Sequence, residues 1–245
     1  THPAKKHLGK SGQDYYNDVM VAHDELVGLM LDQLDELGIA ENTIVFYSTD
    51  NGVHYNTWPD AGITPFRSEK NSNWEGAYRV PAVVRWPAKI APGQVSNEIM
   101  SHLDWMPTLV AAAGDSGLKE DLLKGKRVGS KNSKLHLDGY NFLPYLSGQV
   151  ENGPRREFVY HNDGGMPVCI RVGDWKVVYA ENRAKTMALW AEPEVTLRIP
   201  KLFHLRRDPF ERADHNSNTY WDWAIDKAAW VYMGSAVTTQ YLQTF

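Results

Sequence analysis

The sequence predicts an α/β fold that is followed by a small antiparallel β-sheet and a C-terminal helix. Residues 14–37 have the pattern of an amphipathic helix, and residues 43–47 follow as an apolar, β-branched strand, which together form an α/β unit. From residue 157 onward, short strand-like segments alternate with turn residues. We therefore expect two parts, residues 1–140 and residues 141–245.

The composition is that of a globular protein large enough for a sizeable core, with 245 residues, 42% of them hydrophobic and 23% charged. The net charge of −4 gives no reason to expect a nucleic-acid partner. Cys169 is the only cysteine, which excludes an internal disulfide and a zinc site built from cysteines. No apolar run approaches the roughly 20 residues that cross a bilayer, so no membrane partner is expected.

The first helix is predicted with both of its ends. Asp14 can cap the N-terminus, and Gly38 fits the C-terminal stop. Apolar residues recur between them at steps of three and four and form one stripe: Val19, Ala22, Leu26, Met30, Leu34 and Leu37. His23 and Asp24 lie in the same helix, and we interpret both as structural residues.

The predicted strand at residues 43–47 leads into a polar turn that could bind a cation. We expect this strand to be buried, and Asp50, Asn51 and Gly52 follow it. In open α/β sheets, ligands bind at the C-terminal ends of strands. Carboxylate and amide oxygens are the ligands that Ca2+ and Mg2+ take. The same three residues are also ordinary turn formers, so a plain turn is the alternative.

The segment 53–75 is too long and too polar for a routine connection, and loops of this length are usually functional or disordered. Tyr55, Trp58 and Trp74 argue against disorder. An ordered loop here would form the wall of a pocket beside the preceding turn. Lys70 could direct its ammonium group at an anion in that pocket, although a solvated surface lysine is the more ordinary interpretation.

The next elements are a strand at residues 82–87, predicted to be buried, and a helix at residues 104–113. Asp104 is the expected N-cap of that helix. Residues 119–134 are rich in lysine and glycine and are expected to form a surface excursion.

The C-terminal part is predicted to be a small antiparallel sheet with a final helix at residues 220–232. Its expected strands are residues 157–161, 168–172, 175–180 and, as a fourth candidate, 201–205. Cys169 lies among apolar residues with no base nearby, so we interpret it as a buried core thiol.

Several short motifs occur along the chain in one order. They are His23-Asp24-x-x-Val27-Gly28, Asp50-Asn51-Gly52, Lys70, Glu75-Gly76-x-x-Arg79-x-Pro81, Asp104-Trp105-x-Pro107-Thr108, Gly173-Asp174-Trp175-Lys176 and Leu205-x-x-Asp208-Pro209-x-Glu211. With these motifs the chain resembles a type I sulfatase of the arylsulfatase kind, over nearly all of its length but only for the C-terminal part of the family's chain. The resemblance implies an alkaline-phosphatase-like sandwich portion, with a mixed sheet flanked by helices, ahead of the antiparallel subdomain.

The resemblance implies hydrolysis of a small-molecule sulfate ester with one divalent cation, usually Ca2+, with Mg2+ possible. Asp50 and Asn51 match two of the family's metal ligands, and Lys70 matches a lysine that binds the sulfate group. His2 matches a histidine that contacts the same group, although from the residues alone it would be an exposed terminal residue. A cation, an ammonium and an imidazole donor would stabilise negative charge on the ester and sulfate oxygens.

The family's nucleophile is a formylglycine made from Cys or Ser in a Cys/Ser-x-Pro-x-Arg motif, and the sequence contains no such motif. Cys169 is followed by Ile170 and Arg171, so it does not match. The resemblance places the nucleophile, two metal carboxylates and a further Lys and His in a missing N-terminal part, the expected partner. We therefore expect this chain alone to be inactive. Family analogy favours the bacterial cytoplasm or periplasm but leaves the compartment open.

Two other interpretations remain open. One is a phosphohydrolase or phosphonate hydrolase of the same superfamily; these more often use two metals with His ligands, and the chain has no Asp-x-x-x-His pattern after Asn51. The other is a non-catalytic, metal-dependent module that binds anions or glycans, with the aromatic loop 55–74 stacking on rings.

Overall fold

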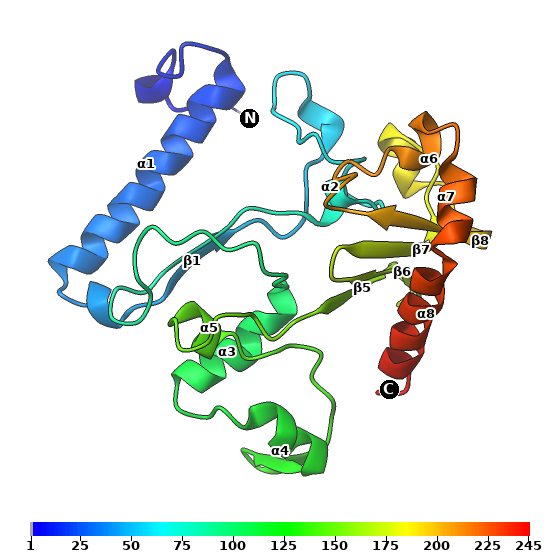
Figure 1. The fold of residues 1–245 in the computed structure, drawn as a ribbon. Helices are drawn as coiled ribbons and strands as arrows, with labels where there is room; N and C mark the ends of the chain where they lie inside the picture. Colours follow the sequence, from blue (N-terminus) through cyan, green and yellow to red (C-terminus); the bar gives the residue numbers. More distant parts are fainter. Residues whose placement is uncertain (1) are drawn as a thin grey trace. The chain divides into compact units, whose positions relative to one another are not determined.

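A computed structural model describes residues 2–245, and the chain divides into two compact units (Figure 1). The first unit runs to Pro92 and includes the distant segment Asn182–Pro193, whereas the second consists of Gly93–Glu181 and Glu194–Phe245. These units do not coincide with the expected division at residue 140, which stays a prediction. Within the described residues, none of the helices is both long and apolar enough for a bilayer crossing.

The first unit contains the long helix α1, Tyr15–Glu36, after a short 3-10 turn at Lys5–His7. Both predicted ends of this helix are confirmed. The Asp14 side chain accepts a hydrogen bond at 2.9 Å from the backbone N–H of Asn17. Gly38 lies in the left-handed region with a φ of 68°, which suits glycine at a helix end.

The strand β1, Val45–Ser48, pairs antiparallel with β2, Ala82–Arg85, in a two-stranded sheet. The prediction that these strands are buried is wrong for the described chain. Phe46 and Tyr47 are each 36% exposed and Val83 is 62% exposed. An apolar run shows that a strand can be buried, but burial needs covering layers, and a two-stranded ribbon by itself leaves both faces open.

The apolar stripe of α1 is exposed as well, at Leu26, Met30 and Leu37. The buried residue of this helix is instead Asp18. Hydrogen bonds from the Ser11 hydroxyl, and then from the backbone N–H groups of Ser11 and Gly9, lower the pKa of Asp18. Polar contacts to the preceding turn therefore hold the start of α1 in place.

In the second unit, the 3-10 turn His102–Asp104 leads into helix α3, Trp105–Ala112. Asp104 is the N-cap residue of α3 by position, as predicted, but its side chain makes no capping hydrogen bond to that helix. Ser101 caps the preceding 3-10 turn, and Asp104 accepts a reciprocal bond from the Ser101 N–H at 2.8 Å. Asp104 is fully buried, and the Arg155 guanidinium donates to both of its oxygens at 2.9 and 2.6 Å. A buried ion pair with a distant partner thus determines the place of this carboxylate.

The lysine-rich excursion folds into short elements. These are helix α4, Leu118–Lys124, and a hairpin of β3, Lys126–Val128, with β4, Lys131–Ser133, before the short helix α5, Leu143–Leu146.

A four-stranded antiparallel sheet forms the centre of the second unit. Its strands follow the order β5, Glu157–His161; β6, Pro167–Val172; β7, Trp175–Glu181; and β8, Val195–His204. The predicted antiparallel sheet is therefore confirmed, although its fourth strand begins earlier than expected. Cys169 is completely buried in β6, as predicted for a core thiol.

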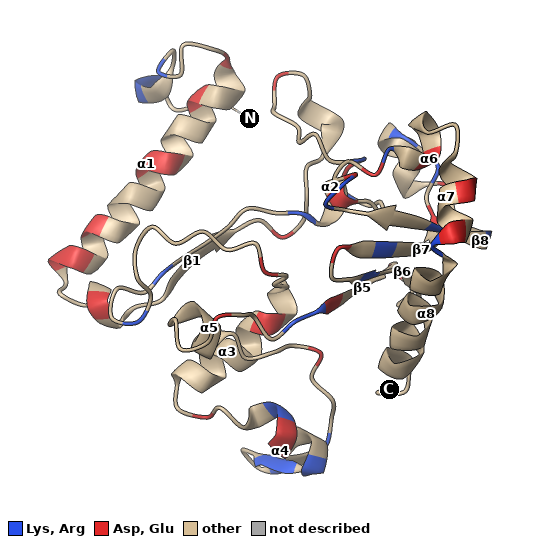
Figure 2. Cartoon of the chain, viewed as in Figure 1, with Lys and Arg blue, Asp and Glu red and all other residues tan. Residues whose placement is uncertain are grey.

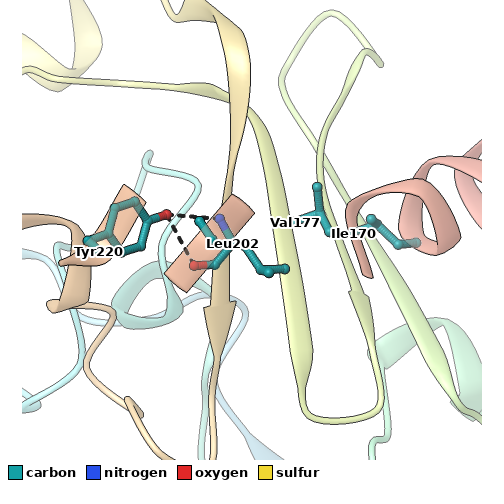
Figure 3. Close-up of a cluster of buried hydrophobic side chains, with 5 residues drawn as sticks. Ile170, Val177, Leu202 and Tyr220 are labelled. Carbon is teal, nitrogen blue, oxygen red and sulfur yellow. Dashed lines mark hydrogen bonds between the residues drawn. The ribbon is translucent and has the colours of Figure 1, made fainter. Parts of the chain in front are cut away.

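The last helices cover this sheet in two pieces instead of the single predicted helix, which breaks at Lys227. After the short helix α6, Ala213–Asn216, they are α7, Tyr220–Asp226, and α8, Ala228–Leu242. Helix α8 packs against β6 and β7 and carries no charged residue (Figure 2). Tyr220 closes the core beside Leu202: its hydroxyl accepts from the Leu202 N–H at 2.9 Å and donates to the Leu202 carbonyl at 3.1 Å (Figure 3).

The buried Asp104–Arg155 pair gives a prediction about stability. Arg155→Met leaves the Asp104 carboxylate buried without its counter-ion, so we expect a loss of roughly 3–5 kcal/mol in the free energy of unfolding. Urea unfolding followed by circular dichroism measures it. The matched control is Arg156→Met, since Arg156 pairs with Glu98 at 3.3 Å on the surface and such pairs contribute about 0–1 kcal/mol. Equal losses in both variants would contradict the assignment.

Candidate functional site

A hollow of about 640 Å³ opens in the first unit at the C-terminal end of β1. Its wall contains Tyr16, Thr49, Asp50, Asn51, Gly52, Val53, His54, Asn56, Thr64, Lys70, Arg79, Pro81 and Trp190. Three of the four site residues predicted from the sequence, Asp50, Asn51 and Lys70, are therefore brought together in one pocket. His2 does not line it; its ring lies edge-on to Tyr15, with ring centroids 6.3 Å apart.

Close backbone contacts join the turn after β1 to the segment that carries Lys70. The N–H of Gly52 donates to the Ala77 carbonyl at 2.7 Å, and the N–H of Lys70 donates to the Val53 carbonyl at 2.7 Å. At Gly52, an added Cβ would overlap the carbonyl oxygen of Gly76. Glycine is thus required at Gly52 because two stretches of main chain touch there, and their contact sets the distance between the two halves of the pocket.

Gly76 makes a second contact of the same kind. A Cβ there would overlap the carbonyl oxygens of Ser68 and Arg67, and the Gly76 N–H donates to the Arg67 carbonyl at 2.8 Å. Gly76 is the second residue of the short helix α2, Glu75–Tyr78. The predicted Glu-Gly-x-x-Arg motif therefore has a structural role, since it packs the main chain against the loop before Lys70.

The oxygen donors of Asp50 and Asn51 are adjacent and accessible. Asp50 is exposed, and within residues 2–245 its carboxylate makes no hydrogen bond or ion pair. The Asn51 side-chain amide nitrogen donates to the Gly52 carbonyl at 2.8 Å, which fixes the amide and leaves its oxygen as the acceptor end. Two hard oxygen donors of this kind suit Ca2+ or Mg2+.

This donor set fits such a cation in chemistry but supplies only part of its coordination. Ca2+ takes six to eight oxygen ligands and Mg2+ takes six. The part of the chain that the structure describes has no group of three or more His, Cys, Asp or Glu residues placed to hold a metal ion. Asp50 and Asn51 therefore provide only two of the ligands, and water molecules or donors outside this pair would complete the coordination.

Lys70 supplies an uncompensated positive charge to the pocket. No carboxylate in the described residues pairs with its ammonium group, whose Nζ lies 5.8 Å from the centre of the Trp190 ring. The other cation of the wall, Arg79, is engaged: its Nε donates to Glu75 at 2.7 Å, and its guanidinium lies over the Phe66 ring. Lys70 is therefore the better placed of the two to attract an anion.

The loop ahead of Lys70 is held by a buried carboxylate. Glu69 accepts a hydrogen bond at 2.7 Å from the N–H of Tyr55, in the 3-10 turn Tyr55–Thr57, and the Tyr55 hydroxyl donates to the Ser68 carbonyl at 3.1 Å. Burial, and then the Glu69 charge, raise the pKa of Tyr55. The loop is ordered as predicted, but Tyr55 and Trp58 do not line the pocket.

The wall also contains residues that were not predicted as site residues, among them Tyr16, His54, Arg79 and Trp190. His54 and Arg79 lie inside segments already singled out, so their nearness to Asp50 and Lys70 in sequence was an available signal. Trp190 has no such signal, because it reaches the pocket from the segment between β7 and β8, which belongs to the first unit only in the fold.

The known proteins and the family model that this chain is similar to are all described as sulfatases. The family model described as Sulfatase matches residues 6–115. Steryl-sulfatase from Mus musculus is 34% identical over 226 residues, covering 83% of this chain and 34% of that protein. N-acetylgalactosamine-6-sulfatase from Rattus norvegicus is 29% identical over 242 residues, covering 90% of this chain and 43% of that protein.

One solved structure is similar to nearly all of this chain. The PsFucS1 sulfatase from Pseudoalteromonas sp. superposes with a TM-score of 0.75 at 25% sequence identity, covering 99% of this chain and 46% of that chain. The chain thus spans less than half the length of each of these three proteins.

The glycine contacts predict the effect of a single methyl group. Gly52→Ala forces the two main-chain stretches apart, so we expect a loss of roughly 1–3 kcal/mol in unfolding free energy, measured by urea denaturation. Gly62→Ala is the matched control, since a Cβ at Gly62 meets nothing within 4 Å, and its effect should stay below about 1 kcal/mol. A Gly52→Ala variant as stable as Gly62→Ala would show that the contact does not hold the pocket.

Proposed function

Because the chain belongs to the sulfatase family, we propose that it supplies one part of the active site of a sulfate-ester hydrolase. In this proposal Lys70 binds the sulfate group, and Asp50 and Asn51 contribute two ligands to a divalent cation, Ca2+ or Mg2+. The observation that supports it best is that all three side chains line one pocket. His2 is proposed as a further sulfate contact on the family resemblance alone.

The charges of the pocket support a coupling between cation and sulfate. The Asp50 carboxylate repels a sulfate group in the same hollow, whereas Lys70 attracts it. A divalent cation bound at Asp50 and Asn51 reverses the local sign of charge and would act as a Lewis acid on the bound sulfate. The ammonium group of Lys70 neutralises a sulfate oxygen and orients the ester in the hollow.

We propose that the nucleophile and the remaining cation ligands come from a part of the enzyme outside the described residues. Two observations support this: the chain covers less than half of its relatives, and the described residues contain no complete set of metal-binding side chains. The substrate class is a small-molecule sulfate ester. The chain by itself is then a binding fragment, and turnover of an aryl sulfate by this polypeptide alone would contradict the proposal.

Binding of methyl sulfate to the chain tests these roles without turnover. Loss of the Lys70 ammonium in Lys70→Gln removes a charge-assisted hydrogen bond, so we expect the dissociation constant to rise at least about tenfold in a ligand-observed NMR titration. Lys89→Gln is the matched control, because Lys89 is an exposed lysine of the same unit outside the pocket. Equal weakening in both variants would contradict a specific role for Lys70.

The same titration tests the cation ligands. Added Ca2+ should strengthen methyl sulfate binding to the unaltered chain, because it offsets the Asp50 carboxylate. In Asp50→Ala this dependence on Ca2+ should disappear, whereas Asp60→Ala, at an exposed position outside the pocket, should keep it. Inorganic phosphate in place of methyl sulfate addresses the alternative hydrolase: clearly tighter binding of phosphate would favour a phosphohydrolase.

A further inference from the structure

The segment between β7 and β8 is attached to the loop that carries Lys70. The side-chain amide nitrogen of Asn71 donates to the Leu189 carbonyl at 2.7 Å, and Asn73 Oδ1 accepts from the Asn182 N–H at 3.2 Å. The Asn182 amide nitrogen also reaches the Leu189 carbonyl, at 3.2 Å. Leu189 itself is buried, with 2% of its surface exposed. The segment is therefore fixed to the residues that directly follow Lys70.

This anchoring presents the side chain of Trp190 to the pocket. Trp190 ends the 3-10 turn Thr186–Trp190, directly after the buried Leu189, and remains 52% exposed. It lines the same hollow as Asp50 and Lys70. Its ring centre lies 5.8 Å from the Lys70 Nζ and 6.0 Å from the ring centre of His54. A broad flat apolar surface thus stands beside the one uncompensated cation found in this wall.

We propose that Trp190 is the binding platform for the alcohol part of the sulfate ester, and that this part carries a ring with a face that can stack on indole. The inference rests on the proposed function, because it takes Lys70 as the sulfate contact. A sulfate held at Lys70 places the group attached to its ester oxygen next to the indole face. Planar phenols and the C–H faces of pyranose sugars both stack on indole, whereas a methyl or short alkyl alcohol has no face to offer.

The surroundings of Trp190 agree with a subsite for a ring. Two of the other lining side chains, Tyr16 and His54, are also flat rings, so aromatic surface is present at more than one place in this wall. A sugar or a phenol offers a ring that can lie against such a surface.

The test compares ring-bearing and ring-free sulfates on the full chain in the presence of Ca2+. The probes are 4-nitrophenyl sulfate, galactose 6-sulfate and methyl sulfate, titrated by ligand-observed NMR. In Trp190→Ala we expect the dissociation constant of the ring-bearing probe that fits the site to rise about tenfold, with methyl sulfate unchanged. Trp190→Phe keeps an aromatic face and should recover much of the lost affinity.

The matched control is Trp58→Ala. Trp58 is 54% exposed in the first unit, as Trp190 is, but it does not line the hollow, so its removal should change none of the three affinities. If Trp190→Ala raises the dissociation constant of 4-nitrophenyl sulfate more than that of galactose 6-sulfate, the substrate is an aryl sulfate. The opposite order indicates a sugar sulfate.

Three outcomes distinguish a failure of this inference from a failure of the proposed function. Suppose that methyl sulfate binding depends on Lys70 but that Trp190→Ala leaves the affinities for the ring-bearing probes unchanged. The role of Trp190 is then contradicted, and the sulfate site at Lys70 is still supported. No sulfate binding in the unaltered chain overturns both. Equal weakening of methyl sulfate and ring-bearing probes in Trp190→Ala also overturns the platform, because Trp190 would then act on the sulfate end.

Discussion

The pocket depends on a contact between two stretches of main chain that only glycine permits. Gly52, directly after the Asp50–Asn51 pair, lies against the carbonyl oxygen of Gly76, and the hydrogen bond from Gly52 to Ala77 fixes the approach. Backbone contacts of this kind are stiffer than contacts between side chains, because a main-chain atom cannot rotate out of the way. The main-chain positions of Asp50 and Lys70 are therefore determined by the packing of the chain and not by an attraction between their charges.

This arrangement separates charges that would otherwise neutralise one another. The positive charge of Arg79 is paired with Glu75, and its guanidinium lies over the Phe66 ring. The Glu69 carboxylate accepts a hydrogen bond from the backbone N–H of Tyr55. Asp50 and Lys70 remain without ion-pair partners in the described chain although they share a hollow. Unpaired charges of opposite sign, held apart in one cavity, are suited to a cation and an anion that bind together.

Local features of the fold followed from the sequence because their causes are local. Asp14 caps the N-terminus of α1 and Gly38 follows its C-terminus, and both act within a few residues of the chain. The strands β5 to β7 are joined by short turns between neighbours in sequence. Asp50, Asn51 and Lys70 line one pocket for a related reason, since all three lie on one continuous stretch of chain.

The misses arise where a distant partner or a covering layer decides. Asp104 is an N-cap by position, as predicted, but its side chain is held by Arg155, and no local pattern could reveal that partner. Burial of β1 was inferred from its apolar run, yet Phe46 and Tyr47 are partly exposed because burial depends on what lies against the strand. Trp190 lies after β7 in the sequence, about 120 residues beyond Lys70, and only the fold shows that it lines the same pocket.

Terbium(III), a Ca2+ surrogate with the same preference for oxygen ligands, probes directly whether the turn after β1 binds a cation. Excitation of tryptophan, with Trp190 in the wall of the same hollow, should produce terbium emission that saturates as terbium is added and decreases when Ca2+ competes. We expect Asp50→Ala to abolish this saturable emission and Asp60→Ala to preserve it. Emission that is absent from the unaltered chain, or unchanged in Asp50→Ala, would show that the turn after β1 is not a cation site.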